Sequence, residues 1–89
     1  MSRDYLYRRR IGYETLESNH TNSGVSEEYI LDIMAKCQKD YSFSYDNLYA
    51  LQLMVHLGIL EKRDETYVFA HQSYQDYYHS QELAAVMGV

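Results

Sequence analysis

The sequence predicts a mainly α-helical domain with a single β-hairpin. Three stretches place apolar residues at helical spacing after residues that commonly cap helices: 26–40, 45–57 and 73–86. Between the last two, residues 59–71 divide into two short strand-like runs, Ile59 to Lys62 and Thr66 to His71. The charged residues Arg63-Asp64-Glu65 separate these runs, which is typical of a hairpin with a polar tip.

The helix expected at 26–40 has the clearest pattern. Ser26 is a favourable N-cap, and Glu27 and Glu28 place negative charge in the first turn, where the helix dipole favours it. The expected core stripe follows at positions i, i+4 and i+7, which are Ile30, Met34 and Cys37.

The helix expected at 45–57 begins after Ser42 or Ser44, and either serine can act as its cap. Gly58 follows the last periodic residue and supplies a left-handed stop. Its expected buried face consists of Leu48, Leu51, Met54 and Val55.

The helix expected at 73–86 follows the hairpin directly. Ser73 is its expected N-cap, and Asp76 three residues later comes close to a capping box. Strand alternation places Tyr67, Phe69 and His71 on one side of the preceding strand. His71 therefore stands at the junction of strand and helix, where unpaired N–H groups and the positive dipole end favour anions, phosphate above all.

The order helix, helix, hairpin, helix is a winged-helix-like arrangement that spans residues 25–88, preceded by a helical segment and polar loop at 1–24. The pattern at 3–17 is ambiguous, and we favour a helix that packs loosely or belongs to a larger neighbour. Within it, Arg8-Arg9-Arg10 is interpreted as a solvated helix face rather than a nucleic-acid or targeting signal. Residues 18–24 lack apolar side chains, which predicts a loop.

Composition restricts the partners and the compartment. A net charge of −5 argues against nucleic acid as the main partner. A single cysteine, Cys37, fits a reducing compartment, and no apolar run approaches the length of a membrane span, so we expect a cytoplasmic chain without membrane contact. Eleven tyrosines, whose hydroxyls need partners, are expected at the edge of the core or at an interface.

No catalytic or metal-binding motif is recognisable. His71, Ser73 and Asp76 lie within six residues, whereas a catalytic triad converges from separate elements. Asp76, His79 and Glu82 have the spacing of one helix face but lack further ligands, so we expect a solvated polar face and no metal. No phosphate-binding loop occurs, so the chain is not expected to be an enzyme by itself or to hold a cofactor alone.

One segment carries a family resemblance. The run Phe69-x-His71-x-Ser73-Tyr74-Gln75-Asp76-Tyr77-Tyr78 resembles the motif near the end of the winged-helix domain in NACHT proteins. These are STAND-class signal-transduction ATPases, which include the NLR innate-immune receptors and bacterial relatives. The preceding Leu57-Gly58-Ile59-Leu60-Glu61 is similar to the segment that this family places before its hairpin.

The resemblance implies a regulatory module whose histidine, by position His71, reaches the β-phosphate of ADP bound in a separate NACHT nucleotide-binding domain. Ser73 would then cap a helix next to that site, and exchange of ADP for ATP would move the module aside. Two alternatives stay open: a small adaptor whose tyrosine-rich surface binds protein, and a DNA-binding winged helix. The second is disfavoured because its reading helix, 45–57, contains no arginine or lysine.

Overall fold

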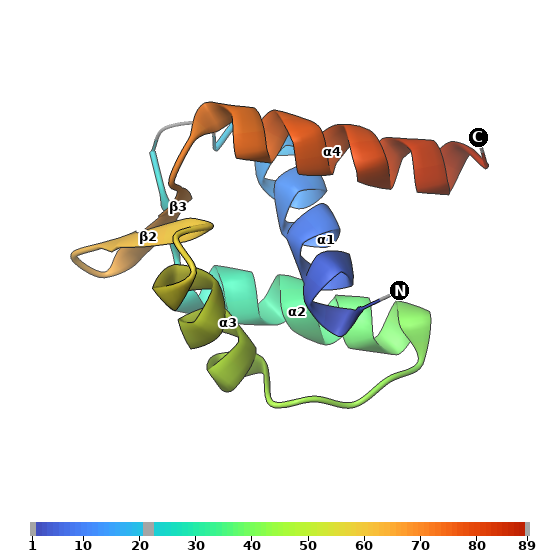
Figure 1. Ribbon diagram of the computed structural model, residues 1–89, viewed down its shortest axis with the longest axis horizontal. Coiled ribbons are helices and arrows are strands. Elements are labelled where there is room, and N and C mark those ends of the chain that lie inside the picture. Colours follow the sequence, from blue (N-terminus) through green and yellow to red (C-terminus); the bar gives the residue numbers. More distant parts are fainter. Residues whose placement is uncertain (1, 21–22, 89) are drawn as a thin grey trace.

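The computed structural model describes residues 2–20 and 23–88 and confirms the mainly α-helical fold with a β-hairpin (Figure 1). Four helices and three strands are present in these residues, in the order α1 (Arg3–Glu17), β1 (Val25–Ser26), α2 (Glu27–Tyr41), α3 (Asn47–His56), β2 (Leu60–Arg63), β3 (Thr66–Phe69) and α4 (Gln72–Met87). Helix α1 packs against both α4 and α2, and it therefore runs between α4 on one side and the α2–α3 pair on the other.

The predicted hairpin is confirmed, and it forms part of a three-stranded sheet. β2 and β3 pair antiparallel with Leu60 opposite Phe69, and the turn between them holds Asp64 at a φ of 56°. β1 pairs with the other edge of β3, which gives the sheet order β1-β3-β2. Gly24 allows this approach, because a Cβ at that position would lie 2.8 Å from Thr66 Oγ1. A strand of two residues is too short to show alternation, so the sequence gives no sign of β1.

The core confirms the apolar stripe of α2. Ser26 caps this helix by accepting a hydrogen bond from the Tyr29 N–H at 3.1 Å, as its sequence position suggests. Helices α1 and α3 and the sheet complete the core around it, whose largest fully buried side chains include Tyr7, Ile11, Ile30, Met34, Leu51, Met54 and Leu60.

The expectation that the N-terminal helix packs loosely is wrong. Tyr7 and Ile11 of α1 are 0% and 1% exposed and belong to the central core. This packing could not be predicted from the sequence pattern, because the buried side of α1 also carries Arg9 and Thr15. The polar groups of both side chains form hydrogen bonds with α4. An apolar stripe is therefore incomplete on this helix even though the helix is central.

Helix α3 also differs from its prediction at its start. Asp46, and neither Ser42 nor Ser44, is the N-cap, and its carboxylate accepts from the Tyr49 N–H at 3.0 Å. Ser42 instead ends α2 in the left-handed conformation. The buried face includes Leu51 and Met54 as expected, but Ala50 is buried while Leu48 is 44% exposed. The predicted stop is confirmed, since Gly58 follows the helix with a φ of 79°.

Candidate functional site

His71 lies at the junction between β3 and α4, as the sequence pattern suggests. It is the N-cap residue of α4, with an extended backbone at φ −136°, and its carbonyl oxygen accepts from the Tyr74 N–H at 3.0 Å. Its imidazole is exposed and meets the Tyr74 ring edge-on, with 4.9 Å between ring centroids. None of the residues described in the structure forms a hydrogen bond with this imidazole, so both ring nitrogens are available to a ligand from outside the chain.

Ser73 does not have its predicted role as the cap. The helix begins one residue earlier, at Gln72, so Ser73 is already inside the first turn and is exposed. The side chain that organises this turn is Gln72, whose Nε2 donates to Gln75 Oε1 at 2.8 Å and to Asp76 Oδ1 at 3.2 Å. The capping box between Ser73 and Asp76 is accordingly absent, and no hydrogen bond joins His71, Ser73 and Asp76 as a triad would require.

The start of α4 is fixed to the end of α1 by Gln75. This side chain is 1% exposed, and its Nε2 donates to Thr15 Oγ1 at 2.9 Å and to the His20 carbonyl at 3.1 Å. On the strand side, the Ala70 N–H donates to the Ile59 carbonyl at 3.0 Å. His71 is thus an exposed side chain on a backbone that is held from both sides.

A second polar cluster, which the sequence interpretation missed, joins α1 to the last turns of α4. Glu82 is 1% exposed, and its two carboxylate oxygens accept from Arg9 Nε and Arg10 Nε at 3.0 Å each. Arg10 also donates to Asp40 at 2.7 Å, and Arg9 donates to the Tyr41 hydroxyl at 2.8 Å. Burial alone would lower the pKa of Arg10, but its hydrogen bonds to Asp40 and Glu82 outweigh this and raise the pKa above its ordinary value.

This cluster corrects two sequence-based expectations. Arg9 is buried and the Arg10 side chain is only 13% exposed, so the arginine run is not a solvated face. Arg8 is also engaged, because it donates to Asp4 and to the Tyr78 hydroxyl. Glu82 likewise does not belong to a solvated face of α4. Charged residues that pair between elements far apart in sequence cannot be recognised as buried from local pattern alone.

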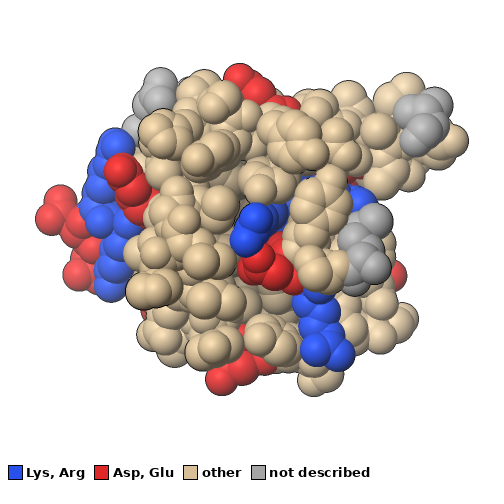
Figure 2. Space-filling view, viewed as in Figure 1, with Lys and Arg blue, Asp and Glu red and all other residues tan. Residues whose placement is uncertain are grey.

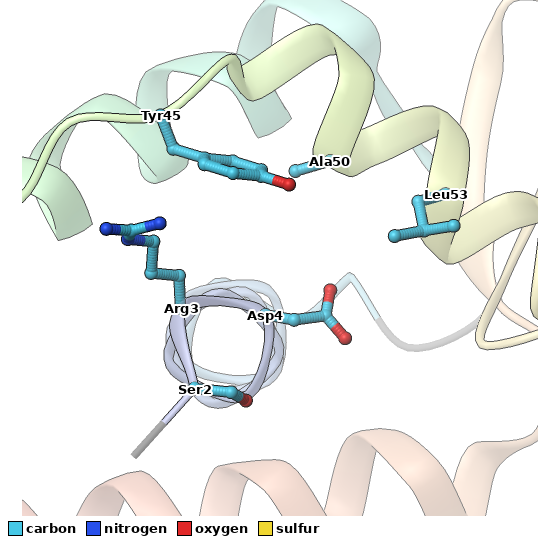
Figure 3. A pocket seen from close by; sticks show the side chains of 6 residues that line it. All are labelled: Ser2, Arg3, Asp4, Tyr45, Ala50 and Leu53. Atoms are coloured by element: carbon cyan, nitrogen blue, oxygen red, sulfur yellow. The ribbon is translucent and has the colours of Figure 1, made fainter.

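An open cleft of about 470 Å³ lies at the start of α1 (Figure 3). Its walls are the first residues of α1 and the start of α3, namely Ser2, Arg3, Asp4, Tyr45, Ala50 and Leu53. The Arg3 guanidinium lies over the Tyr45 ring, 5.5 Å from its centroid. Both signs of charge and several apolar groups meet here, and no single ligand class is favoured.

Comparisons of the chain with protein-family models, with curated proteins and with solved structures give no match. Among the residues described, no group of histidine, cysteine and carboxylate side chains is arranged to hold a metal ion. The described helices also include none whose length and apolar character would let it cross a membrane.

Proposed function

We propose that this chain is the regulatory winged-helix module of a NACHT-type STAND ATPase, closing over ADP held by a separate nucleotide-binding domain. The observation that carries the proposal is the exposed imidazole of His71 at the start of α4, which forms no hydrogen bond with the residues that the structure describes. The motif from Phe69 to Tyr78 supports it by resemblance. In this role the chain is not an enzyme by itself, and ADP or ATP is shared with the partner domain in the cytoplasm.

The chemistry at this junction suits a phosphate group. The first turn of a helix presents N–H groups and the positive end of the dipole, and α4 is 16 residues long. His71 adds a ring N–H donor in front of that turn. Such a contact would exist only in the closed state, so it would shift the balance between closed and open states by its own free energy.

The DNA-binding alternative has less support. Helix α3 carries no arginine or lysine, and Arg63 of the hairpin forms an ion pair with Glu61 at 2.7 Å. On the face shown in Figure 2, basic and acidic side chains lie next to each other, and no broad patch of one sign is seen. Recognition of duplex DNA requires a basic surface along the element that enters the groove.

A protein-interaction adaptor is the second candidate function. The observation that favours it is the outer face of α3 and the residues before it, where Tyr45, Leu48 and Tyr49 are exposed. Aromatic residues of this kind are enriched at protein interfaces. A module that moves within a switch protein also needs such a surface, so this candidate is compatible with the first.

The test is His71→Ala in the native polypeptide that contains this chain, loaded with ADP. Loss of a charge-assisted hydrogen bond worth about 1.5–3 kcal/mol should accelerate ADP release by roughly ten- to a hundredfold. Ser73→Ala is the matched control, since Ser73 is exposed on the same helix turn and makes no cap hydrogen bond. Unchanged ADP release in His71→Ala, or a native polypeptide without a nucleotide-binding domain, would contradict the proposal.

A further inference from the structure

The interface between α1 and α4 contains many polar contacts. Besides Gln75 and Glu82, it includes Tyr5 donating to Gln81 at 3.0 Å and His79 bonded to Glu17 at 2.8 Å. Of the residues of α4, only Tyr78 belongs to the buried hydrophobic cluster. The rest of that cluster comes from α1, α2, α3 and the sheet. Removing α4 from α1 would therefore leave most of the core in place.

The two helices also approach closely at Gly12. Gly12 of α1 faces α4, and a Cβ at this position would lie 2.8 Å from Tyr78 Cβ and 3.1 Å from the His79 backbone nitrogen. A movement that separates the two helices would break the polar contacts between them together, which is the behaviour expected of a cooperative unit that opens as a whole.

We propose that Arg9 and Arg10 form an oxyanion site that Glu82 occupies from within the chain, and that α4 is a releasable helix whose detachment opens this site to phosphate-type ligands. The Glu82 carboxylate accepts from both guanidiniums, and two guanidiniums of this arrangement equally suit a phosphate. After release, Asp40 still faces Arg10 and the Tyr41 hydroxyl still faces Arg9, so both guanidiniums stay held on the α1–α2 side of the opened site. The proposal is independent of any nucleotide domain.

The test is native-state hydrogen exchange of the 89-residue chain, with and without sodium pyrophosphate at constant ionic strength. Because pyrophosphate binds only the opened form, it should accelerate exchange of the α4 amides while leaving those of α2 unchanged. Glu82→Gln replaces charge-assisted hydrogen bonds by neutral ones and should accelerate α4 exchange by about 5- to 30-fold. It should keep the pyrophosphate dependence, since both arginines remain.

Arg10→Gln is the matched variant, because it weakens the same ion pair from the other side. It should also accelerate α4 exchange, but pyrophosphate should then have little effect. Gly12→Ala provides a charge-neutral way to separate the helices, and it should behave like Glu82→Gln. The proposal is overturned if α4 and α2 amides exchange at one common rate in all variants, or if Arg10→Gln stays as sensitive to pyrophosphate as Glu82→Gln.

Discussion

Tyr7→Phe tests whether the tyrosine hydroxyls contribute to stability as ordinary hydrogen bonds. The Tyr7 hydroxyl donates to Asn47 Oδ1 at 2.6 Å and accepts from Gln38 Nε2 at 3.0 Å. The ring is fully buried and meets Phe43 edge-on at 5.4 Å between centroids. Phenylalanine keeps the ring and its packing, so the substitution removes only the hydroxyl.

The expected loss of stability is small because Gln38 and Asn47, the two partners of the hydroxyl, remain hydrogen-bonded to each other. Gln38 Nε2 also donates to Asn47 Oδ1 at 2.7 Å, so neither group becomes an unpaired buried polar atom. We therefore expect a decrease in the free energy of unfolding of about 0.5–1.5 kcal/mol, the net contribution of a typical hydrogen bond. Leaving a buried group unsatisfied would instead cost up to about 3 kcal/mol, and truncation of a large aromatic to alanine about 3–5 kcal/mol.

The measurement is urea unfolding followed by circular dichroism. An unchanged slope of the free energy of unfolding against urea concentration would confirm that the variant and the native chain unfold between equivalent states. Tyr49→Phe is the control, since Tyr49 is 54% exposed, and its change should stay within about 0.5 kcal/mol. A loss near 3 kcal/mol for Tyr7→Phe would show that Gln38 and Asn47 cannot satisfy each other. A gain in stability would show that the buried hydroxyl is unfavourable.

Three further predictions concern titration, thiol reactivity and helix caps. Burial, followed by the hydrogen bond to Glu27, raises the pKa of Tyr67 to about 12 from an ordinary 10.0, so the folded state holds this proton more tightly. The contribution of protonated Tyr67 to the free energy of unfolding should therefore be complete below pH 10 and decline between pH 10 and about 12. Urea unfolding measured across this pH range should show a smaller decline in stability for Tyr67→Phe. Burial raises the pKa of Cys37 to about 11, so a thiol reagent at pH 8 should label it slowly when folded and rapidly in urea. Asp46→Ala should cost about 1 kcal/mol through the lost cap, whereas Ser73→Ala should change unfolding by less than about 0.5 kcal/mol.

The elements with local signals could be predicted from the sequence, and the long-range pairings could not. The cap at Ser26 and the hairpin around Asp64 depend on neighbouring residues and occur as expected. β1 forms because β3 offers an unpaired edge, and α1 is central because it packs against α2 on one side and α4 on the other. The start of α3 shifted because Asp46, closer to the apolar stretch than either serine, supplies an equivalent cap.

In the candidate site, too, the features with local sequence signals could be predicted and the long-range contacts could not. The position of His71 at a strand–helix junction follows from alternation and from the helical pattern behind it. The role of Gln75 as the anchor was not visible, because its partners Thr15 and His20 lie about 60 and 55 positions away in sequence. A fully buried glutamine on a helix with polar neighbours looks like a surface residue until its distant partners are known.

The position of α1 has a consequence for synthesis on the ribosome. Its contacts with α4 join residues 60 to 76 positions apart, so α1 is synthesised well before the helix that packs against it. During that interval the face awaiting α4 carries arginine and tyrosine side chains, which water solvates well. A hydrophobic face waiting equally long would offer nascent chains a surface on which to aggregate. The polar lining of this helix pair thus keeps the uncovered side of α1 solvated until α4 has been synthesised.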